Sequence, residues 1–376
     1  MRILIVTEVF VPISDGLVTR LIEGIRYFKK EGHEVAIITP NRGVNEFEDI
    51  KVYGVRYNRL PFIKKQCWFF SSSDIFDIMQ DFAPDVVHVA NPVIFGALAI
   101  KYANELRLPL VVSYHTNYRK YIKRYHLDKK VFQKVAQSAE HFLYKNATVN
   151  ICTSRALRKR LLDRGVEQVH VLKRGVDVEA FSSQFFSEDM RAILSNGQGE
   201  KKLLVYVGHL SKDKRIESLL PLMKRRKDIS LAIVGDGPEK AALERLFMGT
   251  STVFTGYLKG RTLAEAYASA DALIFPVMED TVGLAILEAM ASKTPVIAAE
   301  STLTNEQFLN GRDILLYDSK NESSLDYAIN CLEDEVLVER ICHIARCEME
   351  NSTWEDASQQ LLDYYHIAHA RATRFN

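Results

Sequence analysis

The sequence predicts an α/β protein of two Rossmann-like domains that face a cleft, each with a doubly wound parallel sheet. Three observations support this fold class. The chain has 376 residues, more than one hydrophobic core usually holds. Short β-branched runs alternate with longer helical patterns, which is typical of parallel βαβ units. The alternation stops at a polar stretch from Ser187 to Lys202 and then starts again with a strand.

The first domain is expected to cover residues 1–190. Its first strand, Ile3 to Val6, is apolar throughout, as expected where helices cover both faces of a sheet. The helix that follows has four apolar residues on one face, namely Leu17, Leu21, Ile25 and Phe28. Further strands are expected at Val35–Thr39, Val86–Val89, Leu110–Tyr114, Val149–Thr153 and His170–Leu172.

The second domain is expected to cover residues 200–355 and repeats the same order of elements. Its strands are expected at Leu203–Val207, Leu231–Val234, Val253–Thr255, Ala272–Phe275, Val296–Ala298 and Ile314–Leu316. Ligands of such folds bind at the carboxyl ends of the strands. The loops after the strands are therefore the regions in which to seek functional residues.

Composition and missing motifs exclude several classes of function. The net charge of +1 gives no overall attraction for nucleic acid or membranes. The five scattered cysteines fit a reduced, cytoplasmic protein, and no apolar run reaches the roughly 20 residues of a membrane helix. The sequence also lacks a full GxGxxG pattern, a P-loop and a nucleophile elbow, which disfavours dehydrogenases, kinases and hydrolases.

The most informative stretch runs from Pro276 to Ala291, where a strand leads through a loop into a helix opened by Gly283. The helix is apolar on nearly every side except at Glu288. A helix that is apolar all round is buried, and a buried carboxylate needs hydrogen-bonding partners such as ribose hydroxyls. The helix start also offers N–H groups to a diphosphate, and Asp280 would lie at the mouth of the same pocket. The alternative is that Glu288 is an ordinary solvated glutamate.

The loop after the strand Leu203–Val207 is a second candidate region. It contains His209, Lys212 and Lys214. Cations at the carboxyl end of a strand would neutralise a departing nucleoside diphosphate. A solvated charged loop explains the same residues equally well.

Two weaker candidates come from the first domain. Gly16 follows the first strand, and His115 ends the strand Leu110–Tyr114. A histidine at the carboxyl end of a strand is well placed to meet a ligand, although a structural role is more common. The sequence has no DxD pair in a suitable loop and no cluster of metal ligands, so neither a metal nor another cofactor is expected.

Residues 119–134 form a basic stretch with interleaved aromatic and aliphatic side chains. Its cations are Arg119, Lys120, Lys123, Arg124, Lys129, Lys130 and Lys134. This pattern fits a basic amphipathic helix that lies on an anionic membrane surface. A solvated helix face with ordinary core aromatics fits it nearly as well.

Six stretches together resemble the family-4 retaining glycosyltransferases of the GT-B fold, over essentially the whole chain. They are Pro84–Val89, Ser113–Tyr118, Arg174–Asp177, Val234–Pro238, Phe254–Gly256 and Asp280–Met290. The resemblance is greatest to the branch of sulfoquinovosyl-, diacylglycerol glucosyl- and GDP-mannose-dependent mannosyltransferases. It implies that the last helix, residues 356–376, packs back on the N-terminal domain.

The resemblance implies a nucleotide-sugar donor site in which His115, Asp280 and Lys214 have catalytic roles. Glu288 would bind the donor ribose and Lys214 the diphosphate. Asp280 replaces a glutamate of the family and would face the donor sugar, while His209 stands where an arginine is usual. The remaining implied contacts are the backbone at Val282, Gly283 and Leu284, the phosphate-loop glycine Gly16, and His115 beside the transferred sugar.

The predicted function is retaining, metal-independent transfer of a hexose from a UDP- or GDP-sugar to a hydroxyl of a lipid or glycan. Two alternatives stay open. One is a nucleotide-sugar 2-epimerase of the same fold, and the other is a non-catalytic nucleotide-sugar-binding protein, which the departures at Asp280 and His209 suggest. The expected location is the cytoplasm, with peripheral contact at the inner face of an anionic membrane, and no nucleic-acid partner is expected.

Overall fold

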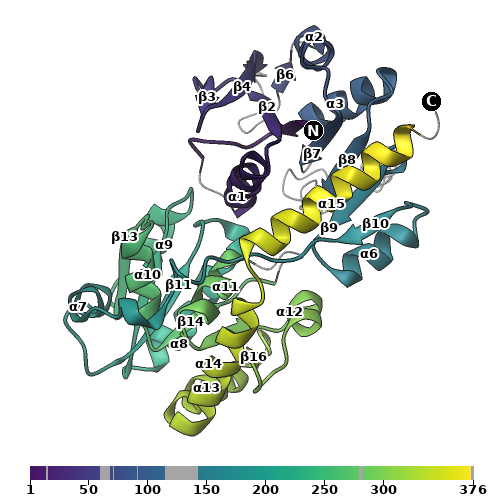
Figure 1. The fold of residues 1–376 in the computed structure, drawn as a ribbon. Coiled ribbons are helices and arrows are strands. Elements are labelled where there is room, and N and C mark those ends of the chain that lie inside the picture. The colour runs from purple at the N-terminus through teal and green to yellow at the C-terminus, as the bar shows by residue number, and fades with distance from the viewer. Residues whose placement is uncertain are drawn as a thin grey trace. The chain divides into compact units, whose positions relative to one another are not determined.

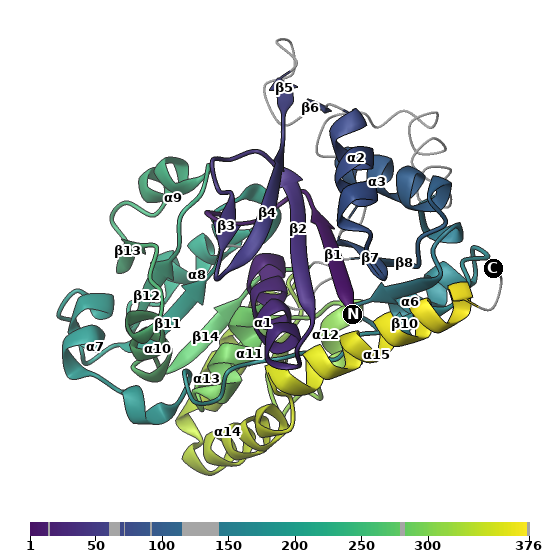
Figure 2. The same ribbon diagram turned by 45° about the horizontal axis from the view of Figure 1, so that its top comes forward.

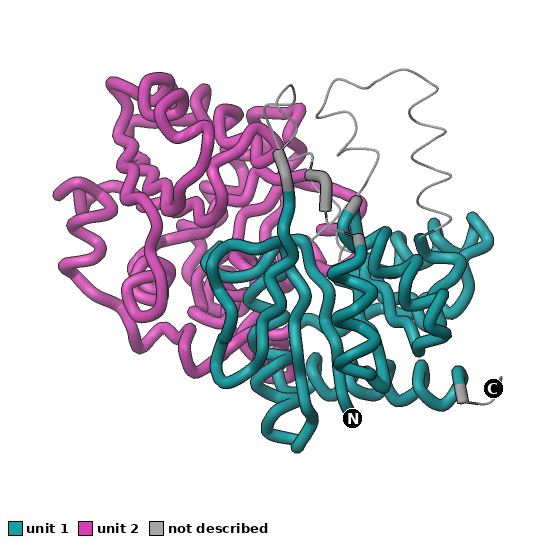
Figure 3. Tube along the Cα trace, turned by 90° about the horizontal axis from the view of Figure 1, so that it is seen from above, with its two compact units in different colours: residues 1–174, 354–376 teal, residues 175–353 magenta. Residues whose placement is uncertain are grey.

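The computed structural model describes residues 1–13, 16–59, 68–70, 72–90, 92–114, 143–278 and 283–373. The chain forms two compact units, coloured separately in Figure 3. Unit 1 contains Met1–Arg174 and Trp354–Asn376, and unit 2 contains Gly175–Thr353. Each unit is built around its own sheet of mainly parallel strands with helices on both faces, so the predicted fold class is confirmed.

Unit 1 has an eight-stranded sheet in the order β10-β9-β8-β7-β1-β2-β4-β3, whose central strands lie side by side in Figure 2. All neighbours pair in parallel except β3 and β4. The strands are β1 (Arg2–Thr7), β2 (Glu34–Pro40), β3 (Glu46–Phe47), β4 (Ile50–Val55), β7 (Val86–Ala90), β8 (Leu110–Tyr114), β9 (Val149–Cys152) and β10 (Val169–Val171). A separate antiparallel pair consists of β5 (Tyr57–Arg59) and β6 (Trp68–Phe70).

Helices cover both faces of this sheet. Successive residues of a strand point to opposite faces, so neighbouring residues of β1 enter two different cores. The helices are α1 (Gly16–Lys30), α2 (Ser72–Phe82), α3 (Ile94–Glu105), α6 (Arg155–Leu162) and α15 (Trp354–Thr373). Leu4 and Val6 of β1 pack in one core with α2, α3 and α6. Ile3 and Ile5 pack in the other core with α1 and α15, which lie against each other (Figure 1). The last helix of the chain therefore belongs to unit 1.

Unit 2 has a six-stranded parallel sheet in the order β13-β12-β11-β14-β15-β16. Its strands are β11 (Lys202–Val207), β12 (Ile229–Val234), β13 (Thr252–Gly256), β14 (Ala272–Phe275), β15 (Val296–Ala299) and β16 (Leu315–Tyr317). Its α-helices are α7 (Glu188–Ser195), α8 (Leu220–Arg225), α9 (Lys240–Leu246), α10 (Arg261–Ala268), α11 (Leu284–Ala291), α12 (Thr302–Gln307), α13 (Glu322–Asn330) and α14 (Glu335–Glu350). Short 3₁₀ helices are η1 (Ser183–Phe185), η2 (Lys212–Lys214), η3 (Ile216–Leu219) and η4 (Cys331–Glu333).

The strand order reverses direction beside the first strand of each sheet. In unit 1 the chain runs from β1 to β2 and later returns to place β7 on the other side of β1. In unit 2 it runs from β11 to β12 and later places β14 on the other side of β11. Open α/β sheets bind ligands at such switch points, outside the carboxyl ends of the strands.

The chain enters unit 2 earlier than the sequence predicted. The polar stretch Ser187–Lys202 is not a linker, because it contains the helix α7. The side chain of Ser187 caps this helix by accepting the N–H of Met190 at 3.2 Å, and Asn196 ends it in the left-handed region. Met190 and Leu194 are buried in the core of unit 2. The polar residues are thus the caps and exposed face of a short helix.

A buried hydrogen-bond chain attaches α15 to the sheet of unit 1. His88 of β7 contacts Ser113 Oγ through Nε2 at 2.8 Å and the hydroxyl of Tyr365 through Nδ1 at 2.7 Å. Burial lowers the pKa of His88 from 6.5 to about 3, so the imidazole is neutral at physiological pH. Each ring nitrogen therefore has one partner, as one donor and one acceptor require.

Replacing Tyr365 with phenylalanine should lower the free energy of unfolding by about 1–3 kcal/mol, because Nδ1 of His88 stays buried without its partner. Tyr364→Phe is the matched control. The hydroxyl of Tyr364 makes a long contact of 3.5 Å with the carbonyl of Val171, at a partly exposed site. Urea denaturation followed by circular dichroism would measure both variants. Equal losses would contradict a special role for the His88 chain.

Candidate functional site

Helix α11 provides the first part of the candidate site, at the switch point of unit 2. Gly283 is its N-cap residue, with φ −65° and ψ 145° and no side-chain cap. A Cβ at Gly283 would come within 3.2 Å of the Phe275 ring, so a larger residue here would require the ring to shift slightly. Every residue of the helix except Leu284 and Glu288 is buried. The expectation of a buried helix with a single carboxylate is confirmed.

Glu288 is oriented by one hydrogen bond and keeps some exposure to solvent. Its Oε2 accepts a bond of 2.7 Å from the hydroxyl of Tyr267, which α10 holds in the core. Within the described ranges, Oε1 has no hydrogen-bond partner. Burial raises the pKa of Glu288 from 4.5 to about 7, and the Tyr267 bond lowers it only in part. The carboxylate can therefore accept further hydrogen bonds from ligand hydroxyls.

Tyr267 was not among the residues expected from the sequence. Its hydroxyl reaches Glu288 from a different helix, and the intervening stretch gives no local signal for the contact. Burial, followed by the charge of Glu288, raises the pKa of Tyr267 well above 10. Tyr267 thus stays a hydrogen-bond donor over the whole physiological pH range.

The loop after β11 forms the second part of the site and is held by glycines. Gly208 and Gly235 have φ values of 154° and 143°. A Cβ at Gly235 would lie 1.9 Å from the carbonyl oxygen of Gly208, and one at Gly237 would lie 2.3 Å from that of Leu210. The N–H of Leu210 donates to the carbonyl of Asp236 at 2.9 Å. The loops after β11 and β12 are therefore packed backbone to backbone.

His209 and Lys214 both lie in the segment that follows β11. His209 is exposed, and its carbonyl accepts a 3.3 Å bond from the hydroxyl of Tyr206. Lys214 ends the 3₁₀ helix η2, with its Nζ 3.6 Å from Oδ2 of Asp213. Because β11 and β14 pair in parallel, this segment and the start of α11 leave the same edge of the sheet. The described parts of both predicted regions thus lie at one switch point.

The other predicted residues are in unit 1 or outside the described residues. Gly16 is the exposed first residue of α1 in unit 1. His115, Asp280 and Val282 lie outside the described residues. So do the basic residues Arg119, Lys120, Lys123, Arg124, Lys129 and Lys130. Among the helices that the structure describes, none is long and apolar enough to cross a bilayer.

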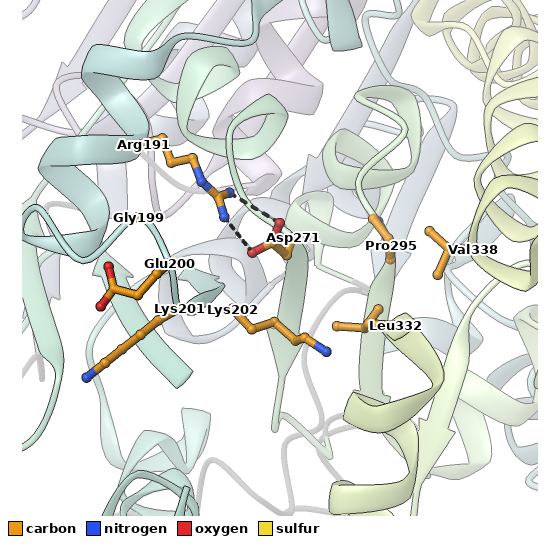
Figure 4. A pocket seen from close by; sticks show the side chains of 9 residues that line it. All are labelled: Arg191, Gly199, Glu200, Lys201, Lys202, Asp271, Pro295, Leu332 and Val338. Atoms are coloured by element: carbon orange, nitrogen blue, oxygen red, sulfur yellow. Dashed lines mark hydrogen bonds and ion pairs between the residues drawn. The ribbon is translucent and has the colours of Figure 1, made fainter. Parts of the chain in front are cut away.

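A pocket of about 370 Å³ in unit 2 lies at the other edge of the sheet, near the amino ends of β11 and β14 (Figure 4). Arg191 forms two bonds to the carboxylate of Asp271, at 3.2 and 2.9 Å. Lys201 donates to Ser251 at 2.8 Å, and Lys202 lies 3.4 Å from the carboxylate of Glu333. Since these cations are already bonded within the protein, the pocket is a poor site for an anionic ligand.

Two family models match the chain. The model described as Glycosyltransferase Family 4 matches residues 14–180, and the model described as Glycosyl transferases group 1 matches residues 188–346. The structure is similar to that of Anabaena HepE in complex with UDP-glucose, with a TM-score of 0.78 at 17% identity, over 97% of this chain and 99% of that one. The GT-B fold is thereby supported by an experimental structure.

Sequence relatives agree with these models. The chain is 35% identical over 360 residues to sulfoquinovosyl transferase SQD2 of Arabidopsis thaliana, covering 92% of this chain and 69% of that protein. It is 29% identical to a GDP-mannose-dependent alpha-mannosyltransferase of Corynebacterium glutamicum, over 97% of this chain and 88% of the relative. It is also 29% identical to alpha-monoglucosyldiacylglycerol synthase of Streptococcus pneumoniae, over 79% and 71%.

The fold and the switch-point site define a GT-B enzyme that transfers a sugar from a nucleotide sugar. The chain belongs to the family-4 glycosyltransferases, in the branch that contains these three relatives. The family and the enzyme class predicted from the sequence are both confirmed.

A methyl group at Gly237 should disturb the packed loops of the site. Gly237→Ala would meet the backbone of Leu210, and such overpacking typically costs about 1–3 kcal/mol. Gly199→Ala is the control, because a Cβ there has no neighbour within 4 Å. Differential scanning calorimetry and titration with UDP and GDP would show lower stability and weaker binding for Gly237→Ala alone. Unchanged values for that variant would show that the loops adjust freely.

Glu288 should make the protein less stable as the pH rises. Between pH 4.5 and about 7 the folded chain keeps a proton that the unfolded chain has released, so the free energy of unfolding falls across this window. Glu288→Gln removes this dependence. The free energy of unfolding of the variant, minus that of the natural protein, should therefore increase by on the order of 1–3 kcal/mol from pH 5 to pH 8. Urea titrations at both pH values measure the difference. A constant difference would show that Glu288 titrates normally.

Proposed function

We propose that this glycosyltransferase transfers a hexose with retention of configuration, without a metal ion, from a UDP- or GDP-sugar to a hydroxyl of a lipid or glycan. The main support for the donor site is the arrangement of Glu288 and Tyr267 at the switch point of unit 2. A carboxylate with one oriented oxygen and one available oxygen suits the two neighbouring hydroxyls of a ribose.

The diphosphate would lie against the segment after β11 and the start of α11. The N-terminus of α11 has no side-chain cap, so its first N–H groups can bind an anion. Lys214 would add positive charge on the same edge of the sheet, and the ring of His209 would offer a hydrogen-bond donor there. As the bond between C1 of the sugar and the β-phosphate oxygen breaks, these groups would stabilise the negative charge on the leaving phosphate.

The acceptor hydroxyl would then bond to C1 from the face that the phosphate leaves, which gives retention. Its proton would pass to an oxygen of the departing diphosphate, so the transfer needs no enzyme-bound intermediate. Within the described ranges, no three His, Cys, Asp or Glu side chains are grouped as metal ligands, and metal independence stays a prediction.

Donor and acceptor are proposed as classes. The relative from Corynebacterium glutamicum is named for GDP-mannose, and Anabaena HepE was solved with UDP-glucose, so both nucleotides are candidates. The name of the relative from Streptococcus pneumoniae contains diacylglycerol, which supports a lipid acceptor. The basic stretch from Arg119 to Lys134 would suit an anionic membrane that holds such a lipid.

The test is incubation of the purified protein with UDP- and GDP-sugars and a total lipid extract, with and without EDTA. Mass spectrometry of the lipid and aqueous phases should show a new glycolipid with one donor, at an equal rate with the chelator. A changed sugar in the aqueous phase would indicate an epimerase instead. Donor that is bound but chemically unchanged would indicate a binding protein.

Replacing Lys214 or Glu288 with alanine should lower kcat/KM by on the order of 10²-fold or more, because each variant loses a contact to the donor. Lys227→Ala is the control for Lys214, since Lys227 is an exposed lysine of the same unit. Transfer at the natural rate by both site variants would refute the assignment of the donor site.

A further inference from the structure

Unit 1 also has a carboxylate at its topological switch point. Glu8 directly follows β1, at the edge where the loops after β1 and β7 diverge. Its Oε1 accepts three backbone hydrogen bonds from the start of α3, from the N–H groups of Val93 (2.8 Å), Phe95 (3.0 Å) and Gly96 (3.3 Å). Oε2 has no hydrogen-bond partner within the described part of the chain, and the side chain keeps some exposure.

The start of α3, which binds Glu8, packs closely against the end of β7. A Cβ at Gly96 would lie 2.6 Å from Cβ of Pro92 and 2.9 Å from Cγ1 of Val89, so the first turn of α3 packs at a distance that only glycine allows. Val93, at the N-cap position, provides no side-chain cap. The capping oxygen comes instead from Glu8, far away in the sequence.

Capping alone does not account for an ionisable residue at this position. Burial raises the pKa of Glu8 from 4.5 to about 7, although the three N–H donors act in the opposite direction. A glutamine carbonyl could accept the same backbone bonds without the cost of desolvating a charge. A carboxylate that is fixed on one oxygen and available on the other, at a switch point, is the arrangement found at Glu288 in unit 2.

We propose that Glu8 is a positioning residue for the acceptor: Oε2 accepts a hydrogen bond from a hydroxyl group of the acceptor molecule. This inference rests on the proposed transferase function. The chemistry of the site selects the ligand class, because a carboxylate oxygen attracts O–H donors and repels phosphate groups. The three N–H donors on Oε1 fix the direction of Oε2, so a bound hydroxyl would be held in one orientation.

Glu8→Gln tests this role, because the amide keeps a carbonyl for the cap and loses the charge. Asp85→Asn is the matched control. Oδ2 of Asp85 also accepts a backbone bond, from the N–H of Arg2 at 2.7 Å, but Asp85 lies at the amino end of β7, on the opposite edge of the sheet. Both variants exchange one carboxylate for an amide in unit 1.

Initial rates would be measured with the active donor and with vesicles of phosphatidylglycerol that contain diacylglycerol, or with the acceptor identified in the lipid extract. For Glu8→Gln, kcat/KM for the acceptor should fall on the order of 10- to 100-fold, as for loss of a hydrogen bond to a charged group. The Kd for the nucleoside diphosphate should stay unchanged, and the melting temperature should not fall. Asp85→Asn should match the natural protein in all three measurements.

Other results would overturn the inference. Unchanged acceptor kinetics in Glu8→Gln, or an equal loss of acceptor and nucleotide affinity, would leave Glu8 as a helix cap only. If Glu8→Gln is poorly folded, the rate per molecule that still binds the nucleoside diphosphate provides a second test. Acceptor binding requires that kcat/KM for the acceptor still be reduced on this basis. A natural protein that makes no glycoside with any donor would refute the transferase function and this inference together.

Discussion

The reversal of strand order beside β1 and β11 is the constraint on which the rest of the structure depends. Where two adjacent parallel strands send their connections in opposite directions, the loops separate and leave the strand ends accessible to a ligand. Both units have this arrangement, and the chain places a partly buried carboxylate at each reversal, Glu8 in one unit and Glu288 in the other. Sheet topology thus determines where a ligand site can form, whichever side chains line it.

Both carboxylates are kept at a cost in stability. Burial raises the pKa of each from 4.5 to about 7, which means that the surroundings disfavour the charged form. The protein offsets part of this cost with hydrogen bonds, from Tyr267 to Glu288 and from the start of α3 to Glu8. Natural proteins accept such local destabilisation where function needs it, because folding requires only a modest net stability.

Glycines position the loops around these groups through backbone contacts. Gly235 and Gly237 let the loops after β11 and β12 touch, and Gly96 lets α3 approach the end of β7. The contacts of Gly235 and Gly237 join loops that follow two different strands, whereas those of Gly96 lie within one strand–helix connection. Loops held in this way can keep polar groups at fixed distances from a ligand, which is what electrostatic stabilisation of a leaving phosphate requires.

The sequence by itself determined the parallel α/β architecture, most strands, the buried helix α11 and its single carboxylate, because these follow from hydrophobic periodicity within a few residues. It did not reveal β4, where isolated apolar residues alternate with polar ones, or the true start of unit 2, because the caps of α7 look like a linker. Only the tertiary structure decided that Tyr267 orients Glu288 and that α3 binds Glu8. Those contacts join residues from separate elements, and strand order, which no local pattern encodes, brings such elements together.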